Sequence, residues 1–305
     1  MNNFNLQIIK HSKIWLFMSG TIVALAIVSF AVFGLNPGID FTGGGLISLH
    51  FDAPAEQSSI IKTVTDLGYE PLVQQADDGS TLIRVRPVSE AEHQEILTAL
   101  RTNVGSLEEL RFDSVGPTIG QELKSKATTA IILVLLIIGL YIAWAFRRVS
   151  RPVASWKYGL ITLLTAFHDV VIPVGVFALL GHFLHYQADT AFVAALLTIL
   201  GYSINDTIVV FDRTRENLHR HRHQGTTFPD TVNNSVNETL ARSMNTTLAT
   251  FLPVLAIVIF GGASTRPFAI TLLAGIFSGA YSSIFVASPL LSMSERWGWK
   301  RKSKV

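Results

Sequence analysis

Residues 127–146 read ATTAIILVLLIIGLYIAWAF, a run of twenty residues without a single charged side chain. A bilayer core about 30 Å thick requires roughly 20 apolar residues in a helix, so this stretch alone predicts one transmembrane helix. Five further stretches have the same length and character: 14–35, 158–181, 190–211, 243–262 and 268–291. The sequence therefore predicts a polytopic α-helical membrane protein with six transmembrane helices.

The composition supports the same class of protein. Of 305 residues, 49% are hydrophobic and 15% are charged, whereas charged residues make up about 25% of a typical soluble domain. The net charge of +2 gives no reason to expect binding to nucleic acid. The absence of cysteine excludes disulfides, thiolate metal sites and cysteine nucleophiles. No Walker motif is present, so we expect no nucleotide hydrolysis, no cofactor and no enzymatic activity.

The distribution of lysine and arginine predicts the orientation of the chain. Sixteen basic residues flank the predicted helices on one side, and only Arg266 occupies the short loops on the other. Since basic flanks stay in the cytoplasm, we expect both termini to be cytoplasmic. The expected division is residues 1–35 for the N-terminus and first helix, 36–126 for an external domain, 127–291 for the remaining helices with a cytoplasmic loop at 212–242, and 292–305 for a basic tail.

The segment 36–126 is long enough for one small folded domain. Its patterns predict a β-α-β-β-α-β order, which is the ferredoxin-like arrangement. A helix over 89–100 begins with Ser89 and Glu92 in the spacing of a capping box. A hairpin turn is predicted at residues 77–79. The strands are expected at 45–51, 71–75, 81–85 and 107–115, and the first helix at 55–67.

Two of the predicted membrane helices contain carboxylates. A charge at the bilayer centre costs about 2.5–3.5 kcal/mol, so such a group usually faces the interior of a bundle and has a role. His168 and Asp169 lie near the middle of the third helix and could handle protons, or Asp169 could be hydrogen-bonded to a neighbouring helix beside a kink at Pro173. Both interpretations remain open.

Asn205 and Asp206 lie in the fourth helix, and Arg242 at the start of the fifth is a natural counter-charge for Asp206. Burial favours the neutral form of a carboxyl group and a nearby arginine favours the charged form, so a group between these effects can exchange protons. The alternative is a structural ion pair. The histidine-rich stretch 219–223 could bind a metal, but alternating residues do not share one helical face, and we interpret it as a solvated basic loop without a metal.

Several motifs resemble those of the SecD/SecF family, which belongs to the RND superfamily. The stretch 38–44 reads GIDFTGG, residues 115–120 read VGPTIG, and residues 201–213 read GYSINDTIVVFDR. Six helices with one small domain after the first also resemble a member of this family. The motif residues are Gly38, Asp40, Phe41, Gly43, Gly44, Gly116, Pro117, Gly120, Gly201, Tyr202 and Ser203.

The resemblance implies an accessory subunit of the bacterial Sec protein-export machinery, located in the bacterial inner membrane. It implies SecD and SecYEG as partners, YajC and YidC as further candidates, and an unfolded translocating polypeptide as the substrate. The family is thought to use the proton motive force in late steps of export. Asp206 and Arg242 match its proton-coupling pair, and Asn205, Asp169 and His168 are further candidates.

Two other functions remain possible from the sequence. An exporter of small molecules or lipids of the wider RND type would also contain carboxylates at membrane depth. A purely structural assembly factor would tolerate neutral residues in place of Asp206 and Arg242, which distinguishes it from a proton-coupled subunit.

Overall fold

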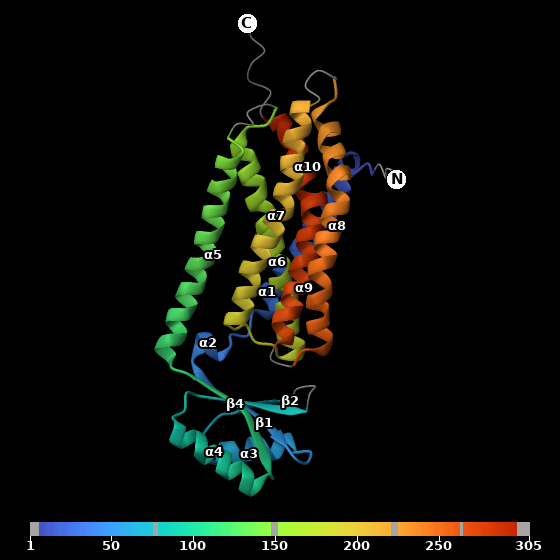
Figure 1. Cartoon of the computed structure of the whole chain (residues 1–305). Coiled ribbons are helices and arrows are strands. Elements are labelled where there is room, and N and C mark those ends of the chain that lie inside the picture. The colour runs from blue at the N-terminus through green and yellow to red at the C-terminus, as the bar shows by residue number, and fades with distance from the viewer. Residues whose placement is uncertain (1–5, 76–78, 148–151, 221–224, 263–264, 298–305) are drawn as a thin grey trace.

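The computed structural model describes residues 6–75, 79–147, 152–220, 225–262 and 265–297. Its long helices form an elongated bundle, and a small mixed domain lies beyond one end (Figure 1). Within the described ranges, six helical segments are long and apolar enough to cross a membrane, which confirms the predicted fold class. These segments comprise α1 (Ser12–Phe33, preceded by the short 3-10 turn Ile9–His11), α5 (Pro117–Ala145), α6 (Ser155–Leu184), α7 (Thr190–Arg220), α8 (Phe228–Phe260) and α9 (Arg266–Ser282), which continues through a π-helical segment (Ser283–Ala287) into α10 (Ser288–Ser294).

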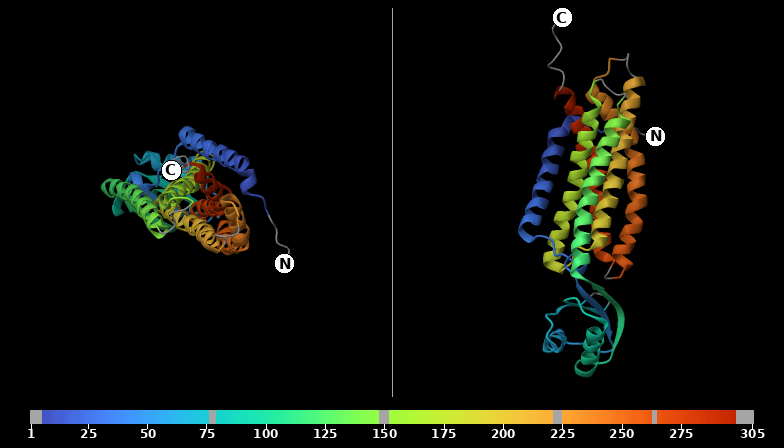
Figure 2. Two further views of the ribbon diagram at one scale, coloured as in Figure 1. Left: turned by 90° about the horizontal axis from the view of Figure 1, so that it is seen from above. Right: turned by 90° about the vertical axis from the view of Figure 1, so that its left-hand side faces the viewer.

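Three helices form the centre of the bundle. In the apolar windows of α6, α7 and the α9–α10 segment, 44%, 50% and 61% of the residues are buried, compared with 11% in α1, α5 and α8. Figure 2, seen along the bundle, places α1 and α5 at its edges. Groups on α6, α7 and α9 are therefore the ones that this chain can shield from lipid by itself.

The helices α7 and α8 extend beyond the apolar stretches that predict them. Hydropathy marks only the part of a helix that lies in lipid, whereas the helical backbone continues into polar sequence. Glu216 forms ion pairs at 2.6 Å with Arg213, one turn before it, and with Arg220, one turn after it, and these pairs support the extension of α7. His219 lies in the last turn of α7, and residues 221–223 of the histidine-rich stretch lie outside the described residues.

The external domain contains a four-stranded antiparallel sheet with the order β2-β3-β1-β4. Its elements are β1 (Gly44–Phe51), α3 (Gln57–Asp66), β2 (Leu72–Gln75), β3 (Ser80–Val85), α4 (Glu90–Asn103) and β4 (Leu107–Val115). Figure 1 shows α3 and α4 together on one side of this sheet, where they enclose an apolar core that includes Ile47, Ile60 and Ile96. The predicted β-α-β-β-α-β order is confirmed.

The predicted capping box of this domain is also present. Ser89 and Glu92 form the capping box, with Glu92 Oε2 accepting from the Ser89 N–H at 2.7 Å. Of the predicted turn at 77–79, only Gly79 belongs to the described residues, and its φ of +81° is a conformation that favours glycine.

Candidate functional site

Asp169 lies at the centre of the bundle with no exposed surface. Its carboxylate accepts hydrogen bonds from Ser278 at 2.9 Å and Ser282 at 2.6 Å, both on α9, and from Ser203 on α7. His168 Nδ1 lies 2.8 Å from Asp169 Oδ1. We call the three serines Ser203, Ser278 and Ser282 the serine cage. A carboxylate has about four lone-pair positions, and the serine cage together with His168 occupies all of them. His168 and Asp169 therefore contact each other, within a network that joins three helices.

Two glycines of α9 allow the close approach on which the serine cage depends. A Cβ atom at Gly279 would lie 2.9 Å from Cβ of Ser203, and one at Gly275 would collide with Ile199. Small residues at this spacing let helix backbones approach closely in membranes. The glycines thus let α9 pack closely on α7, beside Ser203, which belongs to the same network around Asp169.

Asp206 lies on α7 one turn after Ser203, about 4.5 Å further along the helix axis. Its side chain is nearly buried, at 5% exposure. Oδ1 accepts a hydrogen bond from Ser243 of α8 at 2.6 Å. The buried Oδ2 has the Ser283 hydroxyl near it, but no hydrogen bond of normal geometry reaches this oxygen from the described residues. Asp206 is therefore a carboxylate with one oxygen satisfied and one unsatisfied.

The π-helical segment of the last membrane helix begins next to this carboxylate. Ser283, its first residue, shares a hydrogen bond of 2.9 Å with Thr207, the neighbour of Asp206 on α7. π-Helical turns inside α-helices are rare and are frequent at functional sites. The irregular turn of α9–α10 and the unsatisfied carboxylate oxygen thus occur at the same level of the bundle.

Arg242 does not form the predicted ion pair with Asp206. It is exposed on α8, and its neighbour Ser243 makes the contact instead. Successive helical residues point about 100° apart, so the rotation of α8 that turns Ser243 toward α7 leaves Arg242 on the exposed face. The arginine acts on Asp206 only through space. Asn205 is likewise exposed, on the face of α7 that this chain leaves uncovered.

The first two glycine motifs meet where the external domain joins the bundle. A Cβ atom at Gly120, on the first turn of α5, would lie 2.9 Å from the backbone nitrogen of Gly43. Gly43 and Gly44 have φ values of +75° and +148°, which other residues rarely adopt. Glycine is therefore required here both by the backbone conformation and by the close packing of 38–44 (with the short helix α2, Ile39–Thr42) on α5.

Asp40 connects this junction to the fourth membrane helix. Its Oδ2 accepts hydrogen bonds from the backbone N–H of Thr190 at 2.8 Å and from the Thr190 hydroxyl at 2.6 Å. The backbone N–H of Gly38 also donates to Ala188 at 2.7 Å. A carboxylate at the N-terminus of a helix is favoured by the helix dipole. Asp40 therefore attaches the external domain to the same helix that contains Asp206.

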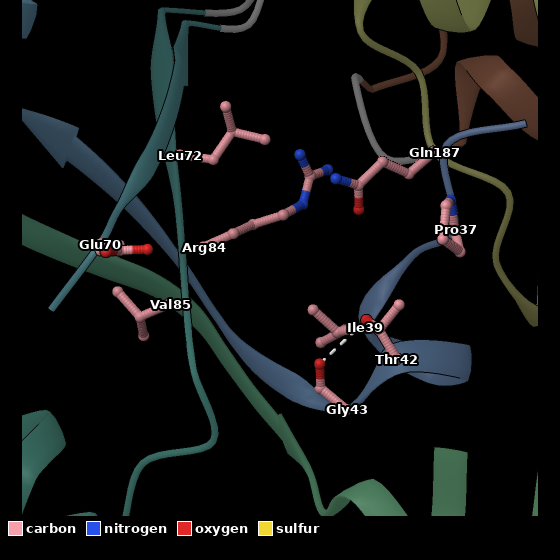
Figure 3. Close-up of a pocket in the computed structure, with 9 residues that line it drawn as sticks. All are labelled: Pro37, Ile39, Thr42, Gly43, Glu70, Leu72, Arg84, Val85 and Gln187. Carbon is pink, nitrogen blue, oxygen red and sulfur yellow. Dashed lines mark hydrogen bonds between the residues drawn. The ribbon is translucent and has the colours of Figure 1, made fainter. Parts of the chain in front are cut away.

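A small cavity of 230 Å³ adjoins the junction, and Figure 3 shows its lining residues. Arg84 of β3 points across it toward Gln187, and its Nη1 donates to Gln74 Oε1 at 2.6 Å. Partial burial lowers the pKa of Arg84 to about 10, and the negative charge of Asp189 opposes this change. Burial, together with the nearby charge of Asp40, raises the pKa of Asp189, while hydrogen bonds such as that from the Phe192 N–H oppose the rise.

Sequence reasoning missed the hydroxyl groups that surround the two carboxylates. Ser203 was recognised only as a motif residue, and the serines at 243, 278 and 282 were not recognised. The available signal was the spacing of Ser278 and Ser282 on one face of an apolar helix. Serine is common at helix contacts in membranes, so that spacing does not by itself indicate a carboxylate partner.

Comparison with known proteins identifies the family. The model described as "Protein export membrane protein SecD/SecF, C-terminal" matches residues 95–297, and the model "SecD/SecF GG Motif" matches residues 28–55. This chain belongs to the SecD/SecF family. The GG match includes the junction glycines Gly43 and Gly44, and the larger match includes Asp169, Asp206 and Arg242.

Individual SecD/SecF proteins are similar over nearly the whole chain. The protein translocase subunit SecF of Sebaldella termitidis is 37% identical over 299 residues, which cover 96% of this chain and 93% of that protein. The SecDF protein of Thermus thermophilus is 36% identical and matches 94% of this chain, although the match covers only 38% of SecDF.

The solved SecD/SecF structures agree with the fold. The crystal structure of Thermus SecDF, described as a translocon-associated membrane protein, superposes with a TM-score of 0.83 at 34% identity. The match covers 96% of this chain and 39% of SecDF. SecDF in its super-membrane-facing form gives a TM-score of 0.69 at the same identity, over 97% of this chain. This chain thus corresponds to less than half of a fused SecDF protein.

Proposed function

We propose that this chain is an accessory subunit of the Sec protein translocase and acts together with SecD in protein export. The similarity to proteins named SecF over nearly their full length supports this role, and the fused SecDF relatives support SecD as the partner. We place the chain in the bacterial inner membrane with both termini in the cytoplasm. In support, the described chain ends lie at the end of the bundle away from the external domain, on the side with most basic flanks (Figure 1).

We further propose that the proton motive force drives this subunit through Asp206. The carrying observation is the buried Oδ2, which no hydrogen bond of normal geometry reaches from the described residues. An ionised carboxylate with such an oxygen is costly in a dry interior, while a protonated one gains an O–H donor. One proton that moves through 100 mV releases about 2.3 kcal/mol, so repeated protonation is a sufficient source of energy without nucleotide.

When Asp206 is protonated, its new O–H group has hydroxyl groups close by that can accept a hydrogen bond. Ser283 and Thr207 share a hydrogen bond beside Asp206, at the start of the π-helical segment. In our proposal, the protonated Oδ2 competes for these hydroxyl groups and changes the register of α9–α10 against α7. Asp40 then transmits the movement of α7 to the external domain, because it holds the N-terminus of that helix.

Asp169 has a different role in this proposal. Its four hydrogen bonds satisfy the carboxylate, so no position is free for a transported proton. We assign the serine cage to holding α6, α7 and α9 together while Asp206 titrates. His168 supports the carboxylate from the same helix.

Arg242 and Asn205 lie on faces of α8 and α7 that this chain leaves exposed. A charged side chain that faces lipid costs a few kcal/mol, which favours a protein partner on this surface. We propose SecD as that partner. SecYEG, YajC and YidC are further candidate partners. The proposed substrate is an unfolded translocating polypeptide. Residues 36–126, the predicted external domain, form the part that moves.

The substitution Asp206→Asn tests this function. The variant keeps a hydrogen-bond acceptor for Ser243 and removes the titration. We expect export into vesicles, driven by SecYEG and its motor in the presence of SecD, to lose its stimulation by an imposed proton gradient. Asp212→Asn is the matched control, because Asp212 lies on the exposed part of α7 and pairs with Arg215. Full gradient-dependent stimulation in the Asp206 variant would refute the assignment.

The alternative function, an RND-type exporter of small molecules or lipids, predicts a different phenotype. A deletion strain would then accumulate toxic apolar compounds while its protein export stayed normal. The presence of carboxylates at membrane depth suits this function as well, and the similarity to export proteins favours the first one.

A further inference from the structure

A second cavity, of 640 Å³, lies at the end of the bundle opposite the external domain, between the N-terminal segment, the start of α8 and the end of α10. Segments from both ends of the chain meet there (Figure 1). The volume is in the range of about 300–1,000 Å³ that is typical of ligand pockets. None of the residues assigned to proton coupling lines it.

The charges around this cavity are unbalanced. Lys10, Lys13 and Arg296 line it and are exposed, and no ion pair of theirs is found within the described ranges. Asp230 is the carboxylate in the lining, and its Oδ2 already accepts a hydrogen bond from the Thr227 hydroxyl at 2.5 Å. Three cations around one hollow repel each other unless an anion lies between them.

Long-range hydrogen bonds hold the cationic walls in place. The Asn233 side chain accepts from the backbone N–H of Ile9 at 3.2 Å, and the Asn237 amide bonds both the N–H and the C=O of Leu6. On the opposite wall, the buried ammonium group of Lys157 donates to the backbone of Ser294 at 2.6 Å, two residues before Arg296. The walls of the cavity are therefore ordered before any ligand binds, and this lowers the entropic cost of binding.

An apolar surface continues from the cavity along α1. Ile14 lines the cavity and is 61% exposed, and Phe17, one turn further along α1, is 79% exposed. Cationic groups followed by exposed apolar groups match the order of groups in a phospholipid, in which a phosphate is followed by acyl chains. Basic pockets between helices at a membrane surface are suited to anionic head groups.

We propose that this cavity binds the phosphate group of an anionic phospholipid, held by Lys10, Lys13 and Arg296, with an acyl chain along Ile14 and Phe17. Guanidinium and ammonium groups both bind phosphate oxygens through charge-assisted hydrogen bonds. The bound lipid neutralises the three cations and links the N-terminal segment to α8 and α10. This site is independent of the proposed proton coupling.

Native mass spectrometry of the full-length protein, released from detergent after incubation with a single lipid, tests the site. We expect phosphatidylglycerol to bind more tightly than phosphatidylcholine of the same chain length. The triple variant K10Q/K13Q/R296Q is expected to lose about fivefold in affinity per cation, on the order of a hundredfold in total. Inorganic phosphate at equal concentration is expected not to displace the lipid, because it lacks the acyl chain.

The control removes the same charge at the same end of the bundle, outside the cavity. The triple variant R147Q/R215Q/R220Q is expected to bind phosphatidylglycerol as the unmodified protein does. The variant K10R/K13R, which keeps both charges, is expected to retain the lipid, and this result separates charge from folding. Equal loss in both triple variants, equal affinity for the two lipids, or displacement by inorganic phosphate would each overturn the proposal.

Discussion

Asp169 and Asp206 are two buried carboxylates that differ in the number of hydrogen-bond donors around them. Asp169 is bonded by three serines and a histidine, and Asp206 by one serine. A buried carboxylate with all its positions satisfied is a structural group, and one with an unsatisfied oxygen is suited to gain a proton. The same substitution should therefore change the stability of the bundle at Asp169 and not at Asp206.

We expect Asp169→Asn to lower the stability of the bundle and Asp206→Asn to leave it nearly unchanged. In Asp169→Asn, the new NH₂ group faces serine hydroxyl groups that donate to the carboxylate in the unmodified protein. Because these bonds are buried and their acceptor is charged, we expect the free energy of unfolding to fall by about 2–3 kcal/mol. At position 206 the amide oxygen still accepts from Ser243. Thermal unfolding in detergent measures both variants. Equal melting temperatures for the two variants would contradict the distinction.

Glu92 allows a prediction about pH at a residue outside the membrane. Hydrogen bonds from the Ser89 backbone and hydroxyl, with a smaller contribution from Arg86, lower the pKa of Glu92 to about 2. A carboxyl group with a lowered pKa in the folded state contributes stability above its unfolded pKa of about 4.3, and this stability is lost as the pH falls toward 2.

The first turn of α4 should therefore become less protected from hydrogen exchange between about pH 4 and pH 2. Glu92→Gln is expected to remove this pH dependence, and Glu108→Gln on β4 serves as the exposed control. The same pH dependence in the Glu92 variant would show that another group is responsible. Exchange of the α4 amides in the intact protein is the measurement.

At the scale of the elements, the last membrane helix has two functions along its length. Its first half approaches α7 closely at Gly275 and Gly279 and supplies Ser278 and Ser282 to the serine cage. Its π-helical segment Ser283–Ala287 follows immediately, at the level of Asp206. The rigid contact and the irregular turn are thus adjacent, an arrangement that suits a helix with one fixed end and one end able to change its register.

Gly279→Ala should separate α9 from α7. The new methyl group would lie 2.9 Å from Ser203 Cβ, and overpacking of this kind costs about 1–3 kcal/mol. Gly20→Ala on α1 is the control, because a Cβ atom there meets no other atom within 4 Å. Thermal unfolding should show a loss for the first variant and none for the second. An unchanged melting temperature for Gly279→Ala would contradict the close packing.

At the scale of the whole molecule, α7 is the element that connects the parts. It contains Asp206 and Ser203, and Asp40 of the junction holds its N-terminus. Its other end extends, like α8, beyond the apolar stretch. The external domain touches the bundle through few polar contacts, among them the bond from Gln74 to the backbone of His185 at 3.1 Å. Loss of Asp40 should therefore affect the position of the domain more than its fold.

We expect Asp40→Ala to broaden the distribution of distances between spin labels on the external domain and on the bundle, as measured by pulsed electron spin resonance. Gradient-dependent export should fall severalfold, while the melting of the external domain stays the same. Asp52→Ala in the same domain is the control, because Asp52 lies outside the junction. An unchanged distance distribution would show that Asp40 is not the main attachment.

The order of the elements, the six membrane helices and the ferredoxin-like domain follow from local sequence. Hydropathy over about 20 residues, the alternation of apolar residues in strands and the Ser89–Glu92 capping box all act between neighbours in the chain. The family motifs are local as well, which is why residues 38–44 and 201–213 indicate the family by their sequence alone. Local signals of this kind need no knowledge of which helix lies beside which.

The partners of the buried carboxylates depended on the tertiary structure alone. The sequence suggested Arg242 for Asp206 by charge, whereas the packing of α8 on α7 turned Ser243 inward and left Arg242 exposed. The serine cage around Asp169 joins residues up to 113 positions apart, through the close approach of α9 that two glycines permit. Such contacts depend on the rotation and separation of whole helices, and a difference of one residue turns a side chain by about 100°. The sequence determined which groups lie in the membrane, and only the packing decided which of them meet.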